Sequence, residues 1–165
     1  MTDEPAVVAD HRSDSSGFRR SVIAAAVAIG VVLVDQLTKW WAVTRLSSGP
    51  IHVVGTLDLE LSRNTGASFS LFQGKAYELV PVAVALIVVL GAMVWRAPTT
   101  GRAAVLGLII GGALGNLCDR LFRGDHGAVV DFVALHFWPT FNVADASIVV
   151  GCLLLLVSLA RGSRL

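Results

Sequence analysis

Two aspartates lie in strongly apolar surroundings in the stretch 128–147, which reads AVVDFVALHFWPTFNVADAS. Asp131 is flanked by valines and by Phe132, and Asp145 precedes a long apolar run. A carboxylate is costly in such surroundings unless it is paired, hydrated or protonated. Two carboxyl groups that meet and share one proton can activate a water molecule. The stretch is therefore a candidate for a catalytic aspartate pair.

A structural role accounts for one of these aspartates equally well. Asn142 is a good helix N-cap, and Asp145, three residues later, then lies in the first helical turn, where the helix dipole favours an anion. This interpretation gives no reason for Asp131. Asp131 is thus the residue that favours chemistry over helix capping.

The other reactive side chains form no recognisable catalytic or metal-binding pattern. There is no HExxH motif, and His52, His126 and His136 are scattered along the predicted loops. Cys118 and Cys152 lie in apolar runs without metal-ligand spacing, and no serine has a nucleophile-elbow context. We expect no metal and no cofactor, which leaves carboxylate chemistry on water.

Composition indicates an integral membrane protein that forms one compact unit. The 165-residue chain is 55% hydrophobic with a mean hydropathy of +0.72, far above an ordinary soluble domain. Charged residues make up 15%, below the usual quarter. The net charge of +1, without a basic patch interleaved with aromatics, offers no case for nucleic-acid binding.

Four apolar segments predict a membrane all-α fold, a bundle of four transmembrane helices. The polar leader 1–19 is expected to be a disordered cytoplasmic extension of a single domain, 20–165. Period-2 alternation within 51–61 predicts strands, with a hairpin turn at Gly55–Thr56, so we expect a small extracytoplasmic β element within 50–70. The predicted helices cover about 20–43, 79–95, 103–121 and 142–160.

Charge predicts the orientation of this bundle. An even number of helices puts both termini on one side of the membrane. The turn 96–102 and the tail 161–165 hold four arginines and no acids. By the positive-inside rule, both termini are cytoplasmic, and the segments 44–78 and 122–141 are outer loops.

This topology gathers polar residues at the outer end of the bundle. Such groups are expensive within membrane segments and usually face the bundle interior or water. Their gathering indicates an outward-facing site, although Asp35 and Lys39, four residues apart, also fit a simple ion pair within one helix. The gathered residues are Asp35, Lys39, Asn64, Asn116, Asp119, Arg120, Asp131, Asn142 and Asp145.

Five short motifs occur at the outer ends of the predicted helices and in the outer loops. They are DQLTK at 35–39, NTGASFS at 64–70, GGALGNLCDR at 111–120, VVDF at 129–132 and FNVAD at 141–145. In this order, the set resembles the motifs of lipoprotein signal peptidase, also called signal peptidase II. The resemblance covers nearly the whole chain, from Asp35 to Gly151. Ser68 and Ala146 depart from the family pattern, which has alanine and serine there, but both are small.

The resemblance implies a monomeric, multi-pass aspartyl protease of the bacterial cell membrane, active at its extracytoplasmic face. Such enzymes remove the signal peptide of prolipoproteins immediately before a cysteine that carries diacylglycerol, while the lipid stays in the bilayer. The family's catalytic pair falls on Asp131 and Asp145, and Asp145, beside a helix N-terminus, is the better candidate for the ionised partner. Supporting or substrate-holding positions fall on Asp35, Lys39, Asn64, Gly66, Asn116, Asp119, Arg120, Asn142 and Ala144.

Two other classes of function fit the sequence less well. In a small proton- or ion-coupled transporter, membrane carboxylates act as relays, but a relay needs stations across the membrane, and the acids cluster at one face. In a non-catalytic assembly subunit, the glycine-rich segment 103–121 would be a docking face, which leaves Asp131 and Asp145 without a role.

Overall fold

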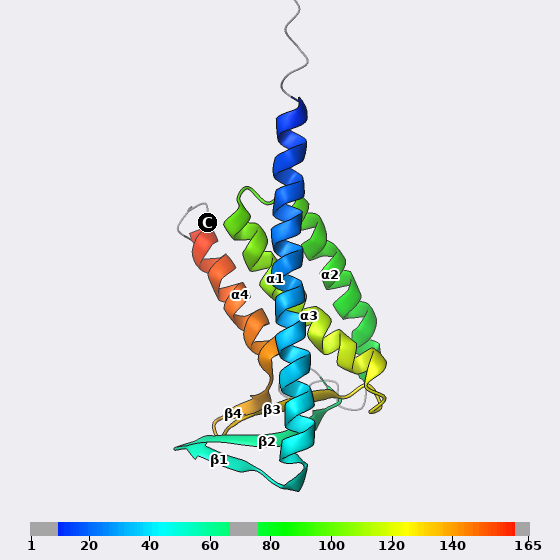
Figure 1. Cartoon of the computed structure of the whole chain (residues 1–165), viewed down its shortest axis with the longest axis vertical. Helices are drawn as coiled ribbons and strands as arrows, with labels where there is room; N and C mark the ends of the chain where they lie inside the picture. Colours follow the sequence, from blue (N-terminus) through cyan, green and yellow to red (C-terminus); the bar gives the residue numbers. More distant parts are fainter. Residues whose placement is uncertain (1–9, 67–75, 161–165) are drawn as a thin grey trace, which may run out of the picture.

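The computed structural model of the chain describes residues 10–66 and 76–160, in which four long helices stand on a small sheet (Figure 1). The helices are α1 (Asp10–Arg45), α2 (Leu79–Trp95), α3 (Thr100–Phe122) and α4 (Val143–Ala160). Short 3₁₀ turns at Leu46–Ser48 and Ala76–Glu78 follow α1 and precede α2. The sheet contains β1 (Ile51–Val54), β2 (Leu57–Asn64), β3 (Val129–Leu135) and β4 (Trp138–Phe141).

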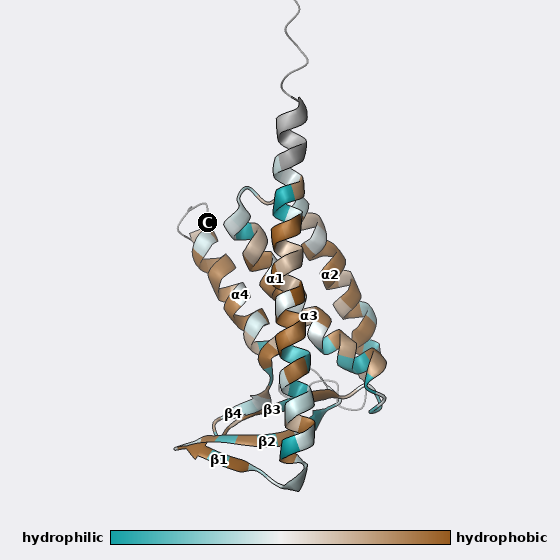
Figure 2. Ribbon diagram, viewed as in Figure 1, coloured by the Kyte–Doolittle hydropathy of each residue, from teal (hydrophilic) through white to brown (hydrophobic). Residues whose placement is uncertain are grey.

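Each helix of this described part is long and apolar enough to cross a membrane, over Ser16–Ser48, Ala76–Trp95, Thr100–Phe122 and Val143–Ala160. The helix α2 shows why the surroundings must be lipid, since it fully buries only Leu90 and Val94 and exposes most of its other large apolar side chains. Figure 2 shows α2 and α4 as mainly hydrophobic, with hydrophilic residues where α1 nears the sheet. The predicted four-helix membrane bundle is confirmed.

Glycines let α3 lie in direct backbone contact with its neighbours. A Cβ atom at Gly107 would come 2.6 Å from the carbonyl oxygen of Ala24 on α1. At Gly112 a Cβ would collide with the carbonyl oxygen of Ala144 on α4. These glycines therefore bring α1 and α4 close to α3 from two sides.

The sheet is antiparallel in the order β1-β2-β3-β4 among the described strands. Val54 pairs with Leu57 across Gly55 and Thr56, which confirms the predicted hairpin turn. Between β2 and β3, Ser62 pairs with Asp131 and Asn64 with Val129. Asn64 and Asp131 are therefore diagonal neighbours, close enough for their side chains to interact.

The largest difference from expectation lies in the segment 122–141, which was predicted to be a loop. It contains β3 and β4, so half of the sheet comes from outside the expected range 50–70, and Asp131 lies on a strand. The valines that isolate Asp131 in the sequence are also strong strand formers, and β2 provides their pairing partner.

The helix boundaries differ less. α2 matches the prediction, α3 and α4 differ by one to three residues, and α1 begins at Asp10, so residues 10–19 of the expected extension are helical. Residues 1–9, the motif positions 67–70 and the arginines of the tail lie outside the described residues. α1 begins and α4 ends on the side of the bundle away from the sheet (Figure 1).

Candidate active site

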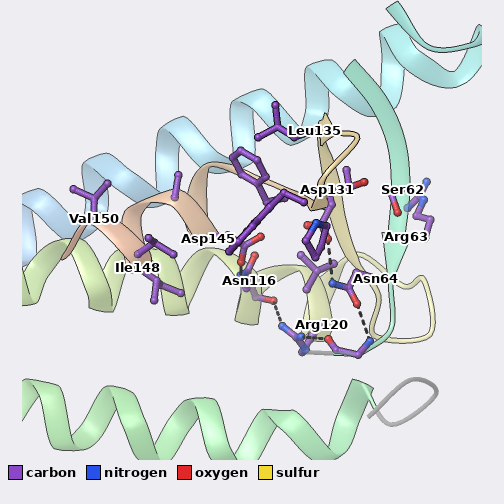
Figure 3. Close-up of a pocket in the computed structure, with 18 of the residues that line it drawn as sticks. Ser62, Arg63, Asn64, Asn116, Arg120, Asp131, Leu135, Asp145, Ile148 and Val150 are labelled. Carbon is purple, nitrogen blue, oxygen red and sulfur yellow. Dashed lines mark hydrogen bonds between the residues drawn. The ribbon is translucent and has the colours of Figure 1, made fainter. Parts of the chain in front are cut away.

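A cavity of about 760 Å³ lies where β2, β3 and β4 meet the ends of α3 and α4 (Figure 3). Its apolar wall includes Phe137 and Trp138 beside β4 and Ile148, Val149 and Val150 of α4. Its polar wall brings together predicted site residues from β3, α3, α4 and the end of β2. These are Asn64, Gly66, Asn116, Arg120, Asp131 and Asp145.

Asp131 is almost fully buried at the back of this cavity, with 2% of its surface exposed. Asn64 donates an amide hydrogen bond to its Oδ2 at 3.1 Å, and Asn142 donates one to its Oδ1 at 2.7 Å. Both carboxyl oxygens therefore have a fixed partner, which orients the group without neutralising it.

Asp145 and Asn142 form a reciprocal cap at the start of α4. The side-chain oxygen of Asn142 accepts the backbone N–H of Asp145 at 2.9 Å, and Asp145 Oδ2 accepts the backbone N–H of Asn142 at 3.2 Å. The capping interpretation is thus confirmed, but it does not compete with catalysis. The same Asn142 side chain that caps α4 with its oxygen holds Asp131 with its nitrogen.

A second amide links the two aspartates from the opposite side. Asn116 donates to Asp145 Oδ1 at 2.8 Å, and its own side-chain oxygen lies 3.1 Å from the amide nitrogen of Asn142. Asp131 and Asp145 thus belong to one continuous hydrogen-bond network through Asn142 and Asn116. Both aspartates line the same cavity.

Burial, and next the charge of Asp145, raise the pKa of Asp131 from 3.8 to about 7, although hydrogen bonds from Asn64 and Asn142 act in the opposite direction. A buried cluster with uncompensated charge is costly. In the described part of the site, one proton on the aspartate pair leaves equal numbers of positive and negative groups. The groups counted are Asp35, Asp119, Asp131 and Asp145 against Lys39, Arg120 and Arg123. Arg63 also lines the cavity, but it is paired with Asp125 and adds no net charge.

Arg120 brings a positive charge to the cavity. Its guanidinium donates to the backbone carbonyl of Gly66 at 3.0 Å and to that of Asn116 at 3.4 Å. Its buried Nε has no hydrogen-bond partner among the described residues. The arginine therefore fastens the end of β2 to α3, and the dashed contacts of Figure 3 show this link beside the aspartates.

The predicted residues Asp35, Lys39 and Asp119 lie behind the cavity and not on its wall. Lys39 Nζ is 2.9 Å from Asp35 Oδ2, Asp119 Oδ2 and Asn116 Oδ1, and these two acids and the lysine have no exposed surface beyond 1%. The ion pair within α1 therefore exists, but it also reaches α3. Ala144 and Asn142 likewise are fully buried behind the wall.

Two contributors to this region were missed from the sequence. Gln36 donates to the carbonyl oxygen of Gly115 and to Asp119 Oδ1, both at 3.1 Å, and accepts from Arg123 at 3.0 Å. Arg123 also donates to Asp119 Oδ1 at 2.9 Å. The spacing of four residues between Asp119 and Arg123 was the signal that could have identified Arg123. Gln36 lies in the DQLTK motif, but apart from its neighbour Asp35 its partners are about eighty residues away along the chain.

No cluster of three or more histidine, cysteine or carboxylate side chains is placed to hold a metal within residues 10–66 and 76–160. Cys118 and Cys152 form no disulfide.

Stability should depend on pH through Asp131. Its pKa is higher in the folded chain than the 3.8 of an unperturbed aspartate, so the folded state binds the proton more tightly. This group's effect lowers the free energy of unfolding by about 1.4 kcal/mol per pH unit from about pH 4 to 7, reaching about 4 kcal/mol, and then levels off. Asp131→Asn should therefore gain stability over the native protein as pH rises from 5 to 8.

Thermal melts of both proteins in detergent across this range check the prediction. Glu60→Gln, at an exposed position of β2, is the matched control. The difference in melting temperature between this variant and the native protein should not grow as pH rises. If the difference in melting temperature between Asp131→Asn and the native protein stayed constant across this pH range, Asp131 would not hold a proton in the folded state.

Comparison with known proteins gives a consistent family. The model of the family described as signal peptidase (SPase) II matches residues 27–161. A lipoprotein signal peptidase of Rhodococcus jostii is 44% identical over 79% of this chain and 69% of that protein. Those of Mycolicibacterium smegmatis and Mycobacterium avium are 40% and 42% identical, over 94% and 84% of this chain and 72% and 79% of their own lengths.

Solved structures agree with the sequence relatives. A structure titled as a bacterial membrane enzyme superposes with a TM-score of 0.76 at 27% identity, covering 84% of this chain and 87% of the other. A second structure of the same description gives a TM-score of 0.72 at 27% identity, over 82% and 91%. The resemblance found in the motifs is thus confirmed, and the chain belongs to the signal peptidase II family of multi-pass membrane proteases.

Proposed function

We propose that this protease removes the signal peptide from prolipoproteins by cutting immediately before the diacylglyceryl-modified cysteine, with Asp131 and Asp145 as the water-activating pair. The observation that carries the proposal is the shared network of Asn142 and Asn116, which joins two carboxyl groups on one cavity wall. The relatives' names give the substrate class, lipoprotein precursors.

The proposed chemistry uses one ionised and one protonated aspartate. Asp145, at the N-terminus of α4, is the anion and takes a proton from the attacking water. Asp131, whose pKa of about 7 favours the protonated form, donates its proton to the oxygen of the scissile carbonyl. When the tetrahedral intermediate collapses, the proton on Asp145 passes to the nitrogen of the leaving amine. The hydroxyl group formed from the carbonyl oxygen returns its proton to Asp131 as the new carboxyl group forms.

The apolar wall suits a substrate that remains partly in the membrane. Ile148, Val149 and Val150, which line the cavity, belong to a membrane-spanning helix. Acyl chains of the substrate can stay against this surface while the peptide bond meets the aspartates. A monomer suffices for this proposal, because both aspartates and their asparagine partners come from one chain.

Purified protein in detergent tests the function directly. A prolipoprotein that carries diacylglycerol on its cysteine should be cleaved, and mass spectrometry should find the new N-terminus at that cysteine. The same precursor without diacylglycerol is the matched control and should be cleaved much more slowly. Equal cleavage of both, or a cut at another bond, would contradict the proposed specificity.

The transporter alternative gains no support from the site. The buried carboxylates of the described residues gather at the sheet end of the helices, and α2 carries no ionisable residue between Leu79 and Trp95. A proton relay across the bilayer would lack stations there.

The proposed orientation has both termini in the cytoplasm and the sheet outside. In a protein whose cysteines are replaced by alanine, Ser48→Cys should react with a membrane-impermeant maleimide on intact cells, and Thr100→Cys should not. Ser48 follows α1 at the sheet end, and Thr100 begins α3 at the opposite end, and both are exposed. If Thr100→Cys reacted and Ser48→Cys did not, the proposed orientation would be wrong and the opposite one correct.

Activity should survive both chelation and removal of the thiols. The proposed mechanism uses carboxyl groups and water, so Cys118→Ala/Cys152→Ala protein with EDTA should keep turnover within about 3-fold of the native protein, since neither change touches groups that transfer protons. Cleavage rates and thermal melts on the same preparations measure this. Loss of turnover while the protein stays folded would contradict the proposed aspartyl mechanism.

A further inference from the structure

Two buried acids hold the backbone immediately before the two proposed catalytic aspartates. Asp119 Oδ2 accepts the N–H of Val130 at 3.1 Å, and Val130 directly precedes Asp131. Asp35 Oδ1 accepts the N–H of Ala144 at 3.0 Å, and Ala144 directly precedes Asp145. The two halves of the pair are therefore anchored in the same way, although one lies on a strand and the other on a helix.

Lys39 joins the two anchors to each other. Its ammonium group lies 2.9 Å from Asp35 Oδ2 and 2.9 Å from Asp119 Oδ2, with no exposed surface on any of the three side chains. Its contact with Asn116 Oδ1, also at 2.9 Å, reaches the amide that donates to Asp145. An ammonium group has three hydrogens to donate, and these three oxygens can use all of them.

We propose that Asp119 and Asp35 are positioning residues that set the separation of Asp131 and Asp145 through the amides of Val130 and Ala144, with Lys39 fixing the distance between the two anchors. This inference rests on the proposed function of the aspartate pair. The pair works as a unit only when its carboxyl groups keep a productive geometry.

The rigidity of the anchors supports a positioning role. Gln36 and Arg123 both donate to Asp119 Oδ1, which leaves its Oδ2 to Lys39 and Val130. A charged acceptor gives shorter and stronger hydrogen bonds to a backbone N–H than a neutral one. A misplacement of about 1 Å at a reacting group can cost about 10²-fold in rate.

Backbone amide exchange tests the anchors without any substrate. In protein labelled with ¹⁵N at valine and alanine, Asp119→Ala should raise the exchange rate of the Val130 amide at least ~10-fold, because that amide loses its acceptor. The Ala144 amide should stay within about 2-fold, since its acceptor remains. Asp35→Ala should give the reverse pattern, and Lys39→Met should speed both amides. If the exchange rates of the Val130 and Ala144 amides changed equally in every variant, or changed in none, the inference would be overturned.

Turnover then shows whether the anchors position the pair. Asp119→Ala should lower kcat about 10²-fold with KM nearly unchanged, whereas Asp119→Asn, which keeps an oxygen acceptor for Val130, should recover most of it. The range of pH over which kcat is high should narrow in Asp119→Ala, because carboxyl groups held less closely couple their protons less strongly. The Asn variant should keep the range wide.

Glu60→Ala, an exposed acid on β2, is the control and should match the native protein in kcat, pH range and exchange. Activity that only follows the folded fraction in thermal melts, with no change in pH range, would overturn the positioning role. If native protein cleaves no prolipoprotein, the proposed function fails, while the crossed exchange pattern still decides whether the two acids anchor the two amides.

Discussion

Asp131→Asn and Asp145→Asn should each abolish cleavage while leaving a folded protein that still binds lipidated substrate. Asparagine keeps the size of the side chain, but it can neither accept the proton of water nor share one across the pair. General acid–base assistance alone is worth roughly 10²–10⁴-fold. Because the two groups act as a unit, the double variant should be little worse than either single variant.

Stability separates this loss from simple unfolding. Removing one carboxyl group relieves like-charge repulsion on the other, so melting temperatures should hold or rise. Asp35→Asn should behave differently, because Asp35 pairs with Lys39 at 2.9 Å and its loss leaves a buried ammonium with less compensation. It should lower stability and slow turnover without abolishing it.

Turnover, substrate binding and thermal melts on the same preparations measure these differences. Glu60→Gln on β2 serves as a carboxylate control at an exposed position. Near-normal turnover of Asp131→Asn would end its assignment to the pair. Loss of turnover that only follows loss of folded protein would do the same.

The long apolar segments were sufficient to predict the helices, because a membrane span requires a long run with few charges. The turn Gly55–Thr56 was equally readable from local alternation. Asp131 could be selected because a carboxylate among valines has no structural explanation of low energetic cost. Asp145 also fits a helix cap, and the family motif was what assigned it to the pair. Local sequence was thus sufficient to predict the helices and to select the two aspartates of the proposed pair.

The strands β3 and β4 and the anchoring hydrogen bonds could not be predicted in this way, because they depend on partners that are distant in the chain. β3 pairs with β2, about seventy residues earlier in the chain. Without that partner in view, the segment was predicted to be a loop. Asp35 meets Lys39 within one helix, but its bond to the Ala144 amide spans 109 residues. Only the packing of α3 against both α1 and α4 brings these groups together, and glycines make that packing possible.

Gly112→Ala should therefore disable the enzyme by moving α4, although Gly112 is not a reactive residue. Its new Cβ would collide with the carbonyl oxygen of Ala144 and lie 2.7 Å from Ile148 Cγ1. A backbone oxygen cannot rotate away as a side chain can, so the first turn of α4 must shift, and Asp145 with it. Overpacking of this kind costs about 1–3 kcal/mol in stability, and a shift near 1 Å costs about 10²-fold in kcat.

Gly30→Ala on α1 is the matched control, because a Cβ there would meet nothing within 4 Å. Alanine is the better helix former by about 0.5–1 kcal/mol, so this variant should be as active as the native protein and no less stable. Steady-state kcat and thermal melts of both variants give the comparison. If Gly112→Ala kept native kcat, close contact between α3 and α4 would not be what holds Asp145 against Asn116, and the cap with Asn142 would have to hold it alone.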